Sequence, residues 1–223
     1  MDRRFLAILA GLIIIFVGIF AISQHSGTKS QDTSSGSTQP TNHTEGQGSK
    51  GVTLVEYGDY ECPVCAEYYQ ALNQFVSQDN SQIYFQFRNL PLTQIHPNAF
   101  ASARAAEAAG LQNKYWQMHD QLYVNQDQWA SAGTPLTLFD QYAKAIGLNL
   151  TQFDQDYSSS KVNDAINADV AVFNKTGQPM ATPTFFLDGK YIDNSQFVDP
   201  STGAPSTSKM QSVINAEIAK KNP

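Results

Sequence analysis

Cysteine and charged residues are scarce in this sequence. Its 223 residues include only two cysteines, Cys62 and Cys65, and 15% charged residues. Two cysteines are too few for a small scaffold held together by disulfides, and they supply only two of the four ligands of a structural zinc site. Lys and Arg number 14 against 20 Asp and Glu, and this net charge of −6 argues against a nucleic-acid partner. We therefore expect the two cysteines to act chemically.

Residues 23–50 lack aliphatic side chains altogether. Of these 28 residues, 20 are Ser, Thr, Gly or Gln. Such a segment buries too little apolar surface to offset the entropy lost on ordering. The composition therefore predicts a flexible linker, in which His25 and His43 are isolated residues in solvent.

Residues 5–22 lack charge and proline over 18 positions. That length is close to the ~20 residues that cross a bilayer as a helix. Arg3 and Arg4 precede the run, so the positive-inside rule places residues 1–4 in the cytoplasm and the rest of the chain outside. A cleaved signal peptide is the alternative, but the run is long for a signal core of ~7–15 residues. Either interpretation delivers the remaining chain to the extracytoplasmic side.

Residues 51–223 carry the patterns of a folded domain. The predicted strands are 52–57, 83–88, 183–187 and 190–192. The predicted helices outside the central region are 63–77, 161–176 and 206–221. The first strand, helix and second strand form a plausible parallel β-α-β unit, and Asp188-Gly189 is a type I′ hairpin signal. A helical stretch over about 95–160 separates these halves, so the order predicts one α/β domain with a helical insertion.

The cysteines stand at the start of the first predicted helix of this domain, in the sequence Cys62-Pro63-Val64-Cys65. Unpaired N–H groups and the helix dipole favour a thiolate there, and proline suits the first helical turn. We expect Cys62 to be the nucleophile and Cys65 to resolve its mixed disulfide. A static disulfide and a metal-binding pair are the alternatives, although no second C-x-x-C and no His cluster accompanies the pair.

Four stretches of the sequence match a known family. They are EYGDYECPVC, FRNLPLTQIHPNAFASARAAEAA, KYWQMHDQLYVNQDQW and GQPMATPTFFLDGKYI. With them, residues 51–219 resemble the DsbA-like branch of the thioredoxin superfamily, in particular its membrane-anchored bacterial members of the BdbD type. The resemblance implies a thioredoxin fold with an inserted helical domain, and a redox-active Cys62–Cys65 disulfide without cofactor or metal.

The resemblance also implies substrate-binding residues beside the cysteines. Pro183 stands where the superfamily keeps a cis-proline, and the backbone of Thr182 is expected to hydrogen-bond an extended substrate. Pro63 and Val64 lie between the cysteines and are expected to contact the same substrate. From the residues alone, Pro183 is only a proline at the start of a strand.

Glu56 stands at the position of the family's buried acid, six residues before Cys62. The resemblance implies that this carboxyl lies beneath Cys65 and transfers its proton through water. Strand alternation allows either face of the sheet, so a partly exposed strand glutamate is the alternative.

Val64 departs from the pattern of DsbA itself, which has histidine at this position. Valine offers no donor or charge to a Cys62 thiolate, so the helix N-terminus and backbone N–H groups must stabilise it. We therefore hypothesise a reduction potential below DsbA's ~−120 mV and above thioredoxin's ~−270 mV.

These features together predict an extracytoplasmic thiol–disulfide oxidoreductase, and in particular a dithiol oxidase. The expected partners are reduced exported proteins as substrates and a membrane-embedded protein that re-oxidises the dithiol, with the enzyme itself a membrane-tethered monomer. A reductase or isomerase is the alternative of the same class. A copper or zinc carrier and a thioredoxin-like binding module are the alternatives of other classes.

Other conspicuous side chains are expected to be structural. His96 should form a turn before the alanine-rich helix, and His119 should be a hydrogen-bonded core histidine. Trp116 and Trp129 should pack in the core or at a domain interface.

Overall fold

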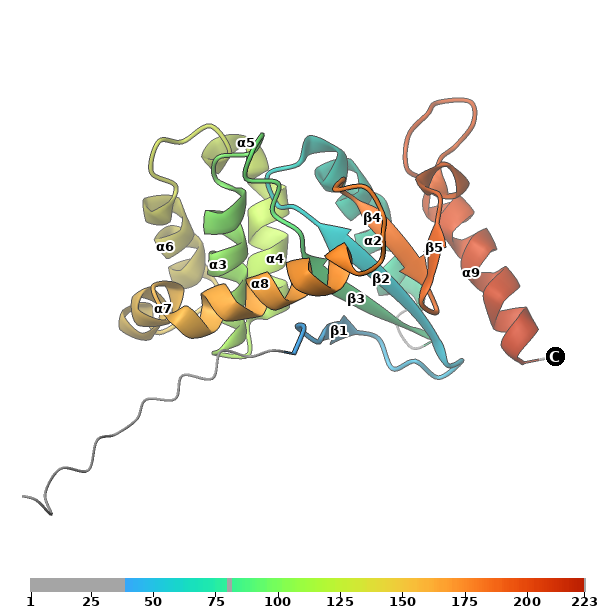
Figure 1. The fold of residues 1–223 in the computed structure, drawn as a ribbon, viewed down its shortest axis with the longest axis horizontal. Coiled ribbons are helices and arrows are strands. Elements are labelled where there is room, and N and C mark those ends of the chain that lie inside the picture. The colour runs from blue at the N-terminus through green and yellow to red at the C-terminus, as the bar shows by residue number, and fades with distance from the viewer. Residues whose placement is uncertain (1–38, 80–81, 223) are drawn as a thin grey trace, which may run out of the picture. The chain divides into compact units, whose positions relative to one another are not determined.

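A five-stranded mixed sheet organises the part of the chain that the computed structural model describes, residues 39–79 and 82–222. The strand order is β1-β3-β2-β4-β5 (Figure 1). Strands β2 and β3 are parallel, and the other neighbours are antiparallel. The strands are β1 (His43–Glu45), β2 (Val52–Gly58), β3 (Ile83–Asn89), β4 (Thr184–Leu187) and β5 (Lys190–Ile192).

Helices cover both faces of the sheet and form the insertion (Figure 1). The α-helices are α2 (Pro63–Asp79), α3 (Ala99–Gly110), α4 (Tyr115–Val124), α5 (Gln126–Trp129), α6 (Leu136–Ala145), α7 (Leu150–Tyr157), α8 (Ser160–Asn174) and α9 (Thr207–Lys221), and η1 (Asn194–Phe197) is a 3₁₀ turn. The predicted β-α-β unit and helical insertion are confirmed, since β2 and β3 flank α2, and α3 to α7 follow β3. The short elements α5 and η1 were not predicted.

Alternation along the strands divides the apolar side chains between the two faces. Leu54, Phe85 and Phe185 pack against α2 and α9 on one face. Tyr57 and Phe186 pack with Phe173 of α8 on the other face. A separate cluster fills the helical domain and reaches both cysteines. The cysteine pair therefore lies where the sheet meets the inserted helices.

The hairpin between β4 and β5 confirms the predicted turn. Asp188 and Gly189 both have positive φ, 49° and 77°, as a type I′ turn requires. The Asp188 carboxylate also accepts the Thr53 N–H at 2.9 Å and pairs with Lys221 at 2.7 Å. The turn is thus tied to β2 and to the C-terminal helix.

The prediction of a flexible linker over 23–50, with a domain starting at 51, is wrong for residues 39–50. Strand β1 pairs antiparallel with β3, with Thr44 opposite Gln86. His43, expected in solvent, lies 2.9 Å from the Glu107 carboxylate and stacks on Tyr115 at 3.4 Å between ring centroids. Polar and aromatic contacts thus order a segment that has no aliphatic side chain.

The predictions for the rest of the N-terminal region lie outside the described residues. They concern the linker over 23–38 with His25, and the anchor or signal over 5–22. Within 39–79 and 82–222, no helix is both long and apolar enough to cross a membrane.

Asp169 on α8 is the buried carboxylate that fixes the N-terminal segment. Its oxygens accept the Thr41 N–H at 2.8 Å and the Thr41 hydroxyl at 2.7 Å. They also accept the backbone N–H of Asn89 at 2.9 Å. Asp169 is fully buried, and desolvation raises its pKa. One side chain therefore joins the segment before β1, the end of β3 and helix α8.

Replacing this carboxylate should destabilise the domain. Asp169→Ala leaves two backbone donors and one hydroxyl buried without a partner, and each such group costs about 1–3 kcal/mol. We expect a clear fall in the urea midpoint. Asp127→Ala, at an exposed position, should stay within about 0.5 kcal/mol of the unchanged protein. Equal midpoints for the two variants would show that Asp169 does not hold the segment.

Candidate active site

The end of β2 delivers the cysteine pair to a helix N-terminus, as the sequence predicted. Helix α2 begins at Pro63, and the Cys62 carbonyl accepts the Ala66 N–H at 3.2 Å, so Cys62 is the N-cap residue. The end of β2 lies close to the Phe87 ring. Glycine at position 58 permits this, because a Cβ there would lie 2.4 Å from the ring. Both cysteines are free thiols.

Asp59 holds the loop between β2 and Cys62. Its backbone carbonyl accepts the Cys62 N–H at 3.1 Å. Its buried carboxylate accepts the N–H groups of Glu61 at 2.8 Å and Leu92 at 2.9 Å, and lies 2.7 Å from Nδ1 of His96. The loop that precedes α3 is thereby fixed beside the cysteines.

Sequence reasoning missed Asp59 as a positioning residue. From the sequence, no role was assigned to Asp59, and His96 was expected to form a turn. The available signals were an acid three residues before Cys62 and a distant histidine. Nothing in their spacing indicates the 2.7 Å contact that joins them.

The helical domain also contacts this loop. The Gln126 side-chain amide donates hydrogen bonds to the carbonyls of Tyr60 at 2.7 Å and Cys62 at 3.0 Å. The Tyr60 hydroxyl donates to Tyr115 at 3.1 Å and lies 3.1 Å from Nδ1 of His119. His119 is 4% exposed, which confirms it as a hydrogen-bonded core histidine. The packing role of Trp129 is also confirmed, since it is fully buried.

The environment of Cys62 favours a thiolate. Hydrogen bonding from the Cys65 thiol is the largest cause, and it outweighs partial burial, so the Cys62 pKa falls from 9.0 to about 6. The Thr182 side chain and the backbone N–H groups of Cys65 and Val64 lower the pKa further. Thr182 Oγ1 is buried without another partner, so its hydroxyl can turn to the sulfur. These donors stabilise the Cys62 thiolate without a charged side chain, which Val64 does not supply.

The environment of Cys65 favours a thiol. Its side chain is fully buried, and desolvation raises its pKa well above 9.0. The hydrogen bond to Cys62, the Cys62 charge and the Glu56 charge raise the pKa further. The two sulfurs, three residues apart, therefore have opposite protonation preferences at neutral pH.

Thr182 and Pro183 lie against Cys62, as the family resemblance implied. The Cys62 thiol donates a hydrogen bond to the Thr182 carbonyl, with 3.5 Å between Sγ and O. The Thr182–Pro183 peptide bond is cis. The loop before β4 thus contacts the reactive sulfur, and Pro63 and Val64 of the cysteine motif are exposed.

Glu56 is buried on the α2 side of the sheet, behind the cysteines. It is 2% exposed, and its Oε1 has no hydrogen-bond partner. Desolvation is the main cause that raises its pKa to about 8, and the nearby Cys62 charge adds to the effect. The alternative of a partly exposed strand glutamate is wrong, because β2 turns this side chain toward the interior.

Three exposed apolar side chains belong to the segments that meet at the cysteine pair. Val64 is 44% exposed, Met180 50% and Ile95 69%. Val64 lies in the cysteine motif, Met180 two residues before Thr182, and Ile95 in the loop fixed by Asp59. Each of these segments therefore presents an apolar side chain to solvent.

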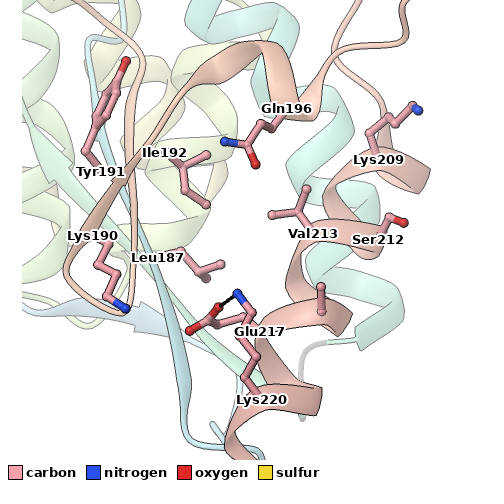
Figure 2. A pocket seen from close by; sticks show the side chains of 11 residues that line it. Leu187, Lys190, Tyr191, Ile192, Gln196, Lys209, Ser212, Val213, Glu217 and Lys220 are labelled. Carbon is pink, nitrogen blue, oxygen red and sulfur yellow. Dashed lines mark hydrogen bonds and ion pairs between the residues drawn. The ribbon is translucent and has the colours of Figure 1, made fainter.

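A groove of about 570 Å³ lies between β5 and α9, away from the cysteines (Figure 2). Leu187, Ile192 and Val213 line it together with lysines, and neither cysteine contributes to it. No chemistry comparable to that at Cys62 is available there.

The difference between the two cysteines predicts a selective reaction with alkylating agents. In the reduced protein, the rate with iodoacetamide should rise with pH, reach half its maximum near pH 6 and level off above it, because the thiolate is the reactive form and the Cys62 pKa is about 6. Peptide mapping should find the label on Cys62 alone. A half-maximal rate near pH 8.5, the value of an unperturbed thiol, would contradict the assignment.

The comparisons with known proteins agree with this architecture. A thioredoxin-like oxidoreductase from Silicibacter pomeroyi has a TM-score of 0.62 and 24% identity, covering 79% of this chain and 91% of that one. BdbD from Bacillus subtilis, in its oxidised form, has a TM-score of 0.64 and 20% identity, covering 81% of this chain and 96% of BdbD. These TM-scores establish a shared fold.

One relative found by sequence is named as an ion antiporter. The Na⁺/H⁺ antiporter NhaA 1 of Mycolicibacterium gilvum is 38% identical over 157 residues, which are 66% of this chain and 23% of the antiporter. This chain thus matches less than a quarter of the antiporter's length.

The family model Thioredoxin_4, described as thioredoxin, matches residues 38–203. The match includes the strand β1 that was not predicted, and it spans well over half of the sequence. The chain therefore belongs to the Thioredoxin_4 family and has the DsbA-like form of the thioredoxin fold.

Proposed function

We propose that this protein is an extracytoplasmic thiol–disulfide oxidoreductase that acts as a dithiol oxidase. The observation that carries the proposal is the opposite protonation preference of the two sulfurs. Cys62 has a pKa of about 6 and favours the thiolate, whereas the buried Cys65 has a raised pKa and favours the thiol. An environment that stabilises the Cys62 thiolate stabilises the reduced form. Stabilising the reduced form makes the Cys62–Cys65 disulfide a stronger oxidant.

The reaction begins with a substrate thiolate that attacks Sγ of Cys62 in the Cys62–Cys65 disulfide. A bond forms between Cys62 and the substrate sulfur, and the Cys62–Cys65 bond breaks to release Cys65 as the leaving thiolate. A second substrate thiolate then attacks the substrate sulfur of this mixed disulfide. The substrate leaves with a new disulfide, and Cys62 leaves as a thiolate that its hydrogen-bond donors stabilise.

Glu56 serves as the proton donor to Cys65 in this scheme. Its pKa of about 8 keeps it protonated at neutral pH, so it can neutralise the Cys65 thiolate as that sulfur leaves. When a partner re-oxidises the dithiol, the Cys65 proton returns to the Glu56 carboxylate. The buried Glu56 thus donates a proton to Cys65 when substrate is oxidised and accepts a proton from Cys65 when the dithiol is re-oxidised.

The exposed surface around Cys62 supports unfolded polypeptides as substrates. Val64, Ile95 and Met180 would offer apolar contact, and the Thr182 backbone beside Cys62 would hydrogen-bond an extended chain. Reduced exported proteins present such chains before they fold. The apolar residues 5–22 support a membrane anchor or a signal that delivers the domain outside the cytoplasm, where a membrane-embedded protein would re-oxidise a monomeric enzyme.

Oxidised protein mixed with a reduced, unfolded two-cysteine substrate tests the proposal. Without any other oxidant, the substrate should gain one disulfide for each Cys62–Cys65 disulfide that is consumed. Mass spectrometry of both partners after acid quenching measures this stoichiometry.

Two variants of equal size provide the controls. When mixed with the disulfide form of the substrate, Cys65→Ser should accumulate a mixed disulfide between Cys62 and the substrate, because the Cys62 thiolate opens the substrate disulfide and no resolving thiol remains. Cys62→Ser should form no mixed disulfide. If the oxidised protein leaves substrate thiols intact while the reduced protein opens substrate disulfides, the enzyme is a reductase and the oxidase proposal fails.

A further inference from the structure

A small cavity lies between the sheet and helices α2 and α4, and Glu56 lines it. It has a volume of about 60 Å³, and we call it the Glu56 cavity. Such a site needs about 10–15 Å³ for each water, so it has room for a short chain of waters. The lining residues come from β1, β2, β3, α2 and α4: Glu45, Glu56, Tyr69, Leu72, Asn73, Val76, Phe85, Trp116, His119 and Asp120.

The inner end of the cavity holds an unpartnered acid. Glu56 is 2% exposed, and its Oε1 is buried without a hydrogen bond. The Cys65 sulfur, whose proton Glu56 exchanges in the proposed reaction, is fully buried. Neither group can therefore exchange a proton with bulk solvent directly.

The reduced protein creates the need for that exchange. When Cys65 leaves as a thiolate, it takes a proton and Glu56 becomes a carboxylate. Because the Glu56 pKa is about 8, this carboxylate takes up a proton at neutral pH. Glu56 must release that proton to solvent before it can accept the Cys65 proton when the dithiol is re-oxidised.

The outer end of the cavity carries two half-buried acids, Glu45 of β1 and Asp120 of α4. The Tyr69 hydroxyl donates to Asp120 Oδ1 at 3.0 Å, and the Asn73 amide donates to that hydroxyl at 2.8 Å. The Trp116 indole N–H donates to the Thr44 carbonyl at 3.2 Å, which fixes β1 at this position. Asn73 is exposed, so this end of the cavity reaches the surface.

Other titratable groups facing Glu56 do not provide an alternative route. The phenols of Tyr60, Tyr68 and Tyr123 all have raised pKa values, mainly because burial disfavours their charged form. Burial lowers the pKa of His119 to about 3, so this imidazole stays neutral. No Lys or Arg lines the cavity within the described chain.

We propose that Glu45 and Asp120 form an acid pair that passes protons between solvent and Glu56 through the water in the Glu56 cavity. This inference rests on the proposed function, because it concerns the proton that Cys65 exchanges. It assigns to strand β1 a part in the reaction as well as in the fold.

The acid pair suits this task electrostatically. Desolvation, followed by the charge of Asp120, raises the Glu45 pKa. Desolvation also raises the Asp120 pKa, although the Tyr69 hydroxyl opposes the shift. A pKa moved toward neutrality makes an acid a better proton relay at physiological pH.

The test uses Glu45→Gln, Asp120→Asn and the double variant, which keep side-chain size and remove the acids. When oxidised glutathione re-oxidises the reduced protein in a single turnover, the step in which Cys65 gives up its proton should slow about 10-fold in the double variant, below the 10²–10⁴-fold that a positioned acid itself contributes. Millimolar imidazole or acetate in the assay should restore part of the rate. The alkylation rate of Cys62 should not change, since that sulfur does not use the cavity.

A second measurement follows the proton without turnover. The carboxyl vibration of protonated Glu56, assigned in infrared spectra by its loss in Glu56→Gln, should shift on transfer to D₂O. This exchange should be slower in the double variant than in the unchanged protein. Asp127→Asn, an exposed acid outside the cavity, is the matched control and should change neither measurement.

The outcomes separate this inference from the function on which it rests. If the unchanged protein oxidises substrate, and the double variant has the same rate, buffer response and exchange time, the acid pair is not the proton route. A slower rate that buffer does not restore, with unchanged deuterium exchange, would assign the acids a structural role and also overturn the inference. If the unchanged protein does not oxidise substrate at all, the proposed function itself fails.

Discussion

The stabilisation of negative charge on Cys62 at the N-terminus of α2 is the interaction on which the rest of the site depends. It needs hydrogen-bond donors at short range, and the Cys65 thiol, the Thr182 side chain and two backbone N–H groups supply them. These donors come from two parts of the fold. Strand β2 and the loop held by Asp59 place the sulfur, helix α2 supplies the Cys65 thiol and the N–H groups, and the loop before β4 supplies Thr182.

Burial keeps the Cys65 sulfur and Glu56 neutral, whereas Cys62 is charged. Both lie behind Cys62 with almost no solvent contact, and desolvation keeps both protonated at neutral pH. The site therefore combines a charged, reactive sulfur at the N-terminus of α2 with a neutral thiol and a neutral acid behind it. Protons must be moved to and from the thiol and the acid but not the Cys62 thiolate, and this demand connects the site to strand β1.

The sequence alone was enough to predict the parts of this architecture that depend on local patterns. Alternation in β2 and β3, the apolar stripe of α2 and the Asp188-Gly189 turn each act over a few residues, so their elements were predicted within one or two positions. The family resemblance added Pro183 and Glu56. Strand β1 could not be predicted, because its order comes from Asp169, Glu107 and Tyr115, which lie more than 60 residues away. The contact of Asp59 with His96 and the grouping of Glu45 with Asp120 likewise arise only in three dimensions.

The equilibrium of the Cys62–Cys65 pair with glutathione tests the central claim most directly. Donors to the Cys62 thiolate should stabilise the reduced form, whereas Val64 adds no charge of its own. The account therefore predicts a reduction potential above about −200 mV but below the ~−120 mV of DsbA. A potential near the ~−270 mV of thioredoxin would contradict it, because it would mean that the thiolate environment does not favour the reduced form and that the pair acts as a reductant.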